Sequence, residues 1–121
     1  MEMEDSNIQI RRKAADERDE EETVQICLKT YRYGAETLIA VCDCDILGRE
    51  FREGNLHIEV CSDFYGDEKA SLSAVEEALQ GATMANLVGC KVVKHAILLG
   101  WVDEDNVLSI DGVLYAQMVK M

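Results

Sequence analysis

The chain has 121 residues, of which 48% are hydrophobic and 30% are charged, a balance typical of one globular domain. Its net charge of −12 disfavours free DNA or RNA as a ligand, because such binding needs lysine and arginine to neutralise phosphates. There is no apolar run near the ~20 residues of a membrane-spanning helix, and the N-terminus is acidic where a signal peptide is basic. We therefore expect a cytoplasmic protein without membrane contact.

The first segment, residues 1–23, is rich in Asp and Glu and has almost no large apolar side chains. Such a segment cannot bury enough surface to offset the entropy of ordering, so we expect an acidic flexible extension. An acidic arm that binds a basic partner is the alternative interpretation. A compact domain is then expected over residues 24–121.

The domain begins with two alternating segments, 24–33 and 36–42, around the turn Gly34-Ala35, a pattern that predicts a β-hairpin. A two-residue loop fixes the register, and alternation then places apolar side chains on both faces. The expected pairs are Leu28 with Val41, Thr30 with Ile39, and Cys27 with Cys42 on the second face. The face that carries Val24, Ile26, Leu28, Ile39 and Val41 should be core.

The region after the hairpin is more varied. Residues 43–48 begin with Asp and end with Gly, which fits a single helical turn. Residues 56–61 alternate as a third strand, with Leu56, Ile58 and Val60 pointing inward. A polar loop over 62–69 should follow and carries two adjacent aromatic residues.

Two helices are predicted in the second half of the domain. The first covers 71–80 and ends near Gly81, with Ser73 and Glu76 at capping-box spacing and Ser71 as a competing cap. The second covers 91–99, with Val92, Ala96 and Leu99 on its packing face. Between the helices, residues 83–88 could extend the first helix or form a short strand, and the bounding glycines favour the strand.

The chain closes with a second hairpin, in which Asp111-Gly112 joins strands over 107–110 and 113–119. The whole order predicts a single α/β (α+β) domain, with a mixed sheet of about five to six strands covered by two helices. If 83–88 and 107–110 are neighbours, the helix between them makes a right-handed crossover.

Several short motifs occur in a fixed order along the domain. They are Tyr31-Arg32, Glu36–Asp43, Leu47-Gly48, Phe51–Gly54, Phe64–Gly66, Ala85–Gly89, Asp103–Val107 and Gly112–Gln117. In this set the chain resembles domain-of-unknown-function family 424, which implies a small archaeal cytoplasmic protein without an established activity. The family's closing pattern usually reads Gly-Val-Pro-His-Ala-Gln, whereas this chain has Leu114 and Tyr115 in place of Pro-His.

The five cysteines are odd in number and lie mostly in apolar segments, so we interpret them as reduced, buried or half-buried thiols. Cys42-Asp-Cys44, with Cys27 and Cys61, is a weak match to zinc-ligand spacing, and we expect no metal and no cofactor. Cys90 at a helix start, with His95 one turn on, has no orienting acid or oxyanion donors and is a weak candidate nucleophile. His57 is interpreted as a solvent-exposed residue.

Asn86 is the most informative polar residue, because an amide in an apolar segment must find hydrogen-bond partners. It either bonds internally, to Gln117 or a backbone carbonyl, or helps to bind a ligand or anion at the following Gly89-led helix start. Phe64 and Tyr65 form a contact loop or pack under the sheet. The candidate binding surface comprises Asn86, Gly89, Gln117, Phe64, Tyr65 and Gly112.

Three functions remain open at this point. The first is a non-catalytic accessory or binding protein of an archaeal cytoplasmic assembly, in its most specific form a translation-linked one, with a protein partner that could be ribonucleoprotein-associated. The alternative is a small enzyme or small-ligand-binding protein that uses the Asn86–Gly89 turn. The third is a homodimer formed through an exposed sheet edge.

Overall fold

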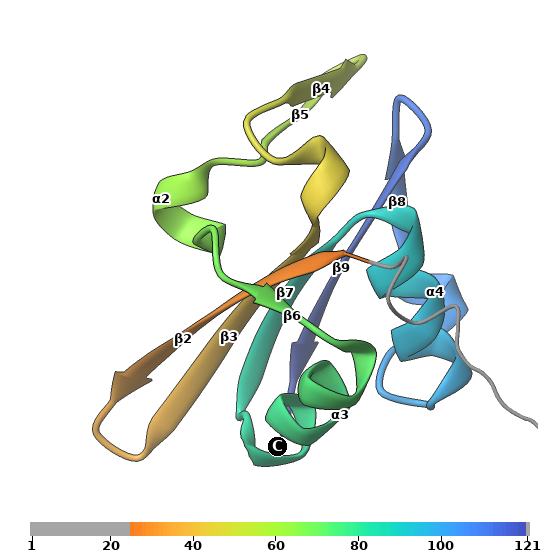
Figure 1. The fold of residues 1–121 in the computed structure, drawn as a ribbon. Coiled ribbons are helices and arrows are strands. Elements are labelled where there is room, and N and C mark those ends of the chain that lie inside the picture. The colour runs from red at the N-terminus through yellow and green to blue at the C-terminus, as the bar shows by residue number, and fades with distance from the viewer. Residues whose placement is uncertain (1–24, 121) are drawn as a thin grey trace, which may run out of the picture.

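The computed structural model describes residues 25–120 and begins with the predicted hairpin, β2 (Ile26–Tyr33) and β3 (Glu36–Asp43) (Figure 1). All three predicted pairs are confirmed, including Cys27 opposite Cys42. Gly34 supports the tight turn with a φ of 61°, which a residue without Cβ adopts at little cost. The predicted acidic extension over 1–23 and the predicted core residue Val24 lie outside the described residues.

The remaining elements follow in chain order. They are η1 (Cys44–Ile46), β4 (Glu50–Glu53), β5 (Leu56–Glu59), α2 (Ser62–Tyr65), β6 (Lys69–Ala70), α3 (Leu72–Gly81), β7 (Met84–Val88), α4 (Cys90–Leu98), η2 (Glu104–Asn106), β8 (Leu108–Ile110) and β9 (Val113–Val119). Six strands form one mixed sheet in the order β6-β2-β3-β7-β9-β8, in which only β3 and β7 are parallel neighbours. The predicted mixed sheet with covering helices is confirmed.

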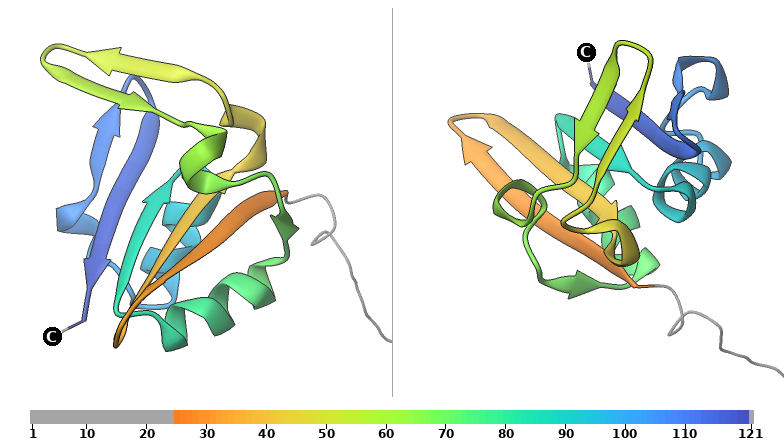
Figure 2. Two further views of the ribbon diagram at one scale, coloured as in Figure 1. Left: turned by 90° about the vertical axis from the view of Figure 1, so that its left-hand side faces the viewer. Right: turned by 90° about the horizontal axis from the view of Figure 1, so that it is seen from above.

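Helices α3 and α4 cover one face of this sheet (Figures 1 and 2). The core between these helices and the sheet includes Ile26, Ile39, Val41, Val75, Leu79, Leu87, Val92 and Val93. Ser71 caps α3 by accepting a hydrogen bond from the Ala74 amide at 3.1 Å, so the competing cap is used and not Ser73. The packing predicted for Leu99 is wrong: α4 ends at Leu98, and Leu99 is exposed.

The strands over 83–88 and 107–110 are not neighbours, so the helix between them does not form the right-handed crossover considered for that case. β7 pairs with β9, and β8 lies beyond β9 at the sheet edge. β9 has seven residues and β8 has three, so the longer strand takes the more buried position and the shorter one forms the edge. The parallel neighbour of β7 is β3, and α3 lies in the connection between them.

The second face is covered by the long segment that follows β3 (Figure 2). Strands β4 and β5 form a separate two-stranded sheet and do not join the main one. The predicted inward position of Leu56 is therefore wrong, because this residue is in the projecting hairpin and is 43% exposed, whereas Val60 is buried. The polar loop predicted for 62–69 contains the short helix α2 and is followed by the two-residue strand β6.

Both faces of the sheet carry apolar cores, as the hairpin register predicted. On the second face Cys27, Ala40, Cys42 and Val88 pack against Phe51, Val60, Tyr65 and Ile110. Between Gln25 and Lys120, no helix has the length and apolar character needed to cross a membrane.

A buried carboxylate fixes the start of α4. Asp43, the last residue of β3, accepts hydrogen bonds from the Lys91 and Val92 amides, each at 3.0 Å. A Cβ on Gly89 would lie 2.7 Å from each carboxylate oxygen, and Gly89 has a φ of 118°, which favours glycine. The close approach of the helix to Asp43 therefore requires glycine at this position.

We predict that Gly89→Ala lowers the free energy of unfolding by about 2–4 kcal/mol, because it strains the backbone and displaces the Asp43 cap. Urea denaturation followed by circular dichroism measures this. The control is Gly81→Ala, at a helical position with open space around the new methyl group, which should stabilise by about 0.4–1 kcal/mol. Equal stability of the two variants would contradict the assigned role of Gly89.

Candidate functional site

Asn86 lies at the centre of a hydrogen-bonded triad on the second face of the sheet. The Tyr65 hydroxyl donates to the Asn86 Oδ1 at 2.6 Å, and the Asn86 Nδ2 donates to the Tyr115 hydroxyl at 3.1 Å. Gln117 is the Cα register partner of Asn86, but its side chain is exposed. The amide is therefore satisfied from within the chain, and by two tyrosines instead of Gln117 or a backbone carbonyl.

The triad borders a cleft of about 340 Å³ between the β4–β5 hairpin and the strands β7, β8 and β9. Apolar side chains supply most of the lining, including Leu56, Ile58, Leu108 and Ile110, and His57 and Glu59 complete it. The two hairpins that border the cleft are joined at their tips, where the Asp111 amide donates to the Glu53 carboxylate at 2.6 Å. The cleft thus combines apolar walls with a small polar patch.

Burial raises the pKa of the Tyr65 phenol above its ordinary value, and Tyr115 adds to the rise. Tyr65 therefore stays protonated and remains a hydrogen-bond donor to Asn86. Because the Tyr115 hydroxyl accepts from Asn86, its own hydrogen remains available to donate to another group. The Asn86 side-chain amide has a second N–H that can also donate. Together with His57 and Glu59, these two donors are polar groups that the cleft can offer to a ligand.

The cleft lining holds few of the side chains that commonly act as nucleophiles. Among the described residues that line it there is no Ser, Thr, Cys or Lys. His57 lies 3.4 Å from the Glu50 carboxylate and is exposed to solvent.

The helix start after Gly89, considered above for anion binding, is occupied by Asp43. Its carboxylate already accepts from the two first-turn amides, of Lys91 and Val92, that an anion would use. An external anion would therefore have to displace a buried carboxylate of the same charge. Gly89 positions α4 and does not line the cleft.

The other predicted residues lie outside the cleft lining. Phe64 stacks on Tyr31 with ring centroids 5.5 Å apart, and its carbonyl accepts from the Tyr31 hydroxyl at 2.6 Å, so it packs under the sheet. Gly112 is exposed in the β8–β9 turn and accepts from the Cys90 thiol at 3.6 Å. Of the six predicted residues, the cleft brings together Asn86 and Tyr65.

Tyr115 is the residue of the triad that sequence reasoning missed as a binding residue. In the sequence, Tyr115 stands out only as a departure from the pattern of the family that the chain resembles. The signal that could have identified it is the alternation along β9, which puts Tyr115 on the same face as Gln117. Pairing of β9 with β7 then places Tyr115 beside Val88 and within reach of Asn86.

The structure does not bring Cys90 and His95 together. The His95 ring lies 3.1 Å from the Glu76 carboxylate of α3, whereas the Cys90 thiol points to Gly112. Over residues 25–120, no group of three or more His, Cys, Asp and Glu side chains could hold a metal ion. All five cysteines are free thiols, two buried and three half-buried.

Comparisons with known proteins agree with the fold. A family model described as "Protein of unknown function (DUF424)" matches residues 31–121. The structure is similar to the crystal structure of an uncharacterized conserved protein from Methanopyrus kandleri, with a TM-score of 0.65 and 21% sequence identity over 80% of this chain and 94% of the other. At this identity the likeness shows the fold alone. Among curated proteins, no sequence matches this chain.

We predict that Tyr65→Phe lowers the free energy of unfolding by about 1–2 kcal/mol, because it removes the donor to the Asn86 oxygen in a buried position. Tyr115→Phe should cost less, about 0.5 kcal/mol, since water can reach the half-buried hydroxyl. Urea denaturation measures both, with Tyr33→Phe at a 60% exposed tyrosine as the control. If Tyr65→Phe were as stable as the control, the hydrogen bond from Tyr65 to Asn86 would not contribute to the free energy of unfolding.

Proposed function

We propose that this chain, which belongs to the DUF424 family of proteins of unknown function, is a non-catalytic binding protein. Its cleft beside Asn86 receives an apolar side chain of a protein partner. One observation carries the proposal: the cleft has apolar walls and a hydrogen-bonding patch, but no nucleophile paired with a base. Such a combination anchors a partner side chain and fixes its orientation.

The exposed leucines beside the cleft support a protein partner. Leu56 is 43% exposed and Leu108 is 46% exposed, and both line the cleft from opposite hairpins. Covering such apolar surface is favourable by about 25 cal/mol per Å². A partner that inserts one side chain between the hairpins would cover both leucines together.

The charge of the protein supports a basic partner. The net charge is −12, and near the cleft Glu59 contributes to the lining while Glu53 and Asp111 lie at the two hairpin tips. Complementary charge speeds encounter with a basic surface and weakens as salt is added. Basic proteins of a cytoplasmic assembly, such as those of the translation machinery, fit this requirement.

We predict that Leu56→Ser and Leu108→Ser each weaken capture of a basic partner from native lysate about tenfold, because loss of an anchoring leucine costs about 1.4 kcal/mol of binding energy. Quantitative affinity purification with the full chain measures the loss. The matched control is Leu98→Ser on α4, where the leucine is 81% exposed and far from the cleft lining. None of the three changes alters the charge.

Two results would contradict the proposal. One is that no basic protein is enriched on the unmodified chain at low salt. The other is that the same basic protein is enriched equally on the cleft variants and on Leu98→Ser, which would place the contact on another surface.

A small ligand is the second candidate function, and the cleft volume of about 340 Å³ favours it because small-molecule sites are typically about 300–1,000 Å³. Nucleotides, sugar phosphates and amino acids are the probes. A ligand at 100 times its Kd should stabilise the fold by about 2.7 kcal/mol and raise the Tm. We predict that such a rise would be lost in Asn86→Ala and kept in Leu98→Ser, and a flat thermal response to all probes would exclude this function.

A further inference from the structure

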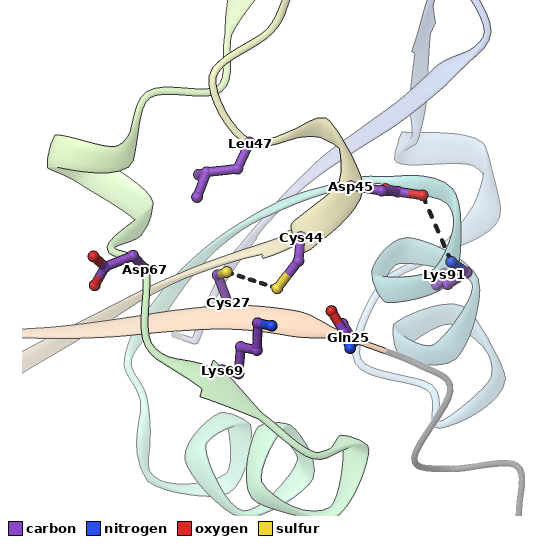
Figure 3. A pocket seen from close by; sticks show the side chains of 8 residues that line it. All are labelled: Gln25, Cys27, Cys44, Asp45, Leu47, Asp67, Lys69 and Lys91. Atoms are coloured by element: carbon purple, nitrogen blue, oxygen red, sulfur yellow. Dashed lines mark hydrogen bonds and ion pairs between the residues drawn. The ribbon is translucent and has the colours of Figure 1, made fainter.

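Two thiols meet at the other end of the second face. Cys27 is on β2 and Cys44 begins η1, and their Sγ atoms are 2.7 Å apart. Figure 3 shows the two side chains pointing toward each other from neighbouring segments. The pair is separate from the cleft and from the hydrogen-bonded triad.

The hairpin register explains why these two sulfurs meet. Cys27 is opposite Cys42, and the Cys44 amide extends the ladder by donating to the Gln25 carbonyl at 2.9 Å. Cys42 and Cys44 are two residues apart, so both side chains point to the face that carries Cys27. A disulfide requires an S–S distance of about 2.05 Å, and the two sulfurs are therefore within about 1 Å of bonding distance.

The thiol pair borders a second cavity, of about 410 Å³. Lys69, Lys91, Asp45 and Asp67 also line it. Cys44 is half-buried and reachable from the cavity, whereas Cys27 is 2% exposed and Cys42 is 0% exposed. Cys44 is therefore the thiol that a molecule in the cavity would meet first.

We propose that Cys27 and Cys44 form a dithiol site that exchanges with a low-molecular-weight disulfide in this cavity. In the first step the Cys44 thiol loses its proton to solvent, and its sulfur attacks one sulfur of the small disulfide. The S–S bond of the small molecule breaks, and its departing thiolate takes up a proton. Cys44 is then joined to the other half in a mixed disulfide.

Cys27 resolves this intermediate. Its thiol loses a proton, its sulfur attacks the Cys44 Sγ, and the bond to the small molecule breaks, so a second small thiol leaves with a proton. The products are a Cys27–Cys44 disulfide and two small thiols from one small disulfide and two protein thiols. Electrons balance, because the protein pair is oxidised and the small disulfide is reduced.

The surroundings of Cys44 set the pH dependence of this exchange. Burial and the neighbouring Cys27 thiol raise the pKa of Cys44 to about 12, and Lys69 opposes the rise. The other titratable groups at the site are Cys42, Asp43, Asp45, Asp67 and Lys91. Because the thiolate is the reactive form, exchange should be slow at neutral pH and should speed up about tenfold per pH unit from pH 7 to 10.

The test uses oxidised glutathione on the full chain in which Cys61 and Cys90, the other half-buried thiols, are replaced by serine. Mass spectrometry of the intact chain should show the loss of two hydrogens, and peptide mapping should join Cys27 to Cys44. The Tm should rise by about 5 °C or more, because the bond constrains the unfolded chain. Dithiothreitol should reverse both changes.

Single variants distinguish the two roles. With oxidised glutathione, the Cys27→Ser variant should keep a glutathione adduct on Cys44, because the resolving thiol is missing. The Cys44→Ser variant should stay unmodified. The Cys42→Ser variant should still form the Cys27–Cys44 disulfide. A Cys27–Cys42 bond, a lasting adduct on Cys44 with Cys27 intact, or no change by pH 10 would each overturn the proposal. A rate that does not rise between pH 7 and pH 8 would equally exclude a thiol as the attacking group.

Discussion

The hydrogen bonds from the first turn of α4 to the buried Asp43 carboxylate fix the position of this helix against the sheet. They join residues 48 and 49 positions apart, at the end of β3 and at the start of α4. Burial raises the pKa of Asp43 above its usual value, although the two amide hydrogen bonds oppose the rise. Burial of the Asp43 carboxyl group costs desolvation energy. Its two hydrogen bonds offset part of this cost, because they satisfy two first-turn amides that have no partner within the helix.

This arrangement also shapes what the protein can bind. A glycine-led turn between a strand and a helix usually leaves amides free for an anion, yet here the anion is part of the chain. The cleft lies on the second face, which is covered by η1, β4, β5 and α2, the first part of the connection from β3 to β7. The next helix along the chain, α3, lies on the opposite face of the sheet.

Local patterns predicted the parts of the fold that are set by neighbours in sequence. Gly34-Ala35 fixed the register of β2 and β3, and Asp111-Gly112 placed the second hairpin, because a short loop leaves one pairing possible. Alternation failed at Leu56, since a period of two shows which residues share a face but not whether another layer covers it.

The candidate site was only half predictable for a related reason. Asn86 was marked by its own burial cost, which is a local property, and Tyr65 by its place beside another aromatic residue. Their meeting with Tyr115 depends on β9 lying next to β7, a choice made by the whole sheet. Gly89 was predicted as part of a binding surface, but Asp43, which fills the helix start behind it, is far away in the sequence, and no local pattern revealed this.

The two cavities described above are both bounded by the same segment, which pairs with the main sheet through the two-residue strand β6. Cys44 begins this segment, and Tyr65 near its other end reaches Asn86. In between, the segment closes on itself, as the Gly48 amide donates to the Val60 carbonyl and the Val60 amide donates to the Arg49 carbonyl. Side-chain contacts and short backbone pairings, and not a continuous ladder, hold the segment against the sheet, so its position depends on the residues that anchor it. The thiol pair and the tyrosine–asparagine triad are two of these polar anchors, and the hydrogen bonds from Tyr31 to the Phe64 carbonyl and from Asp111 to Glu53 are others.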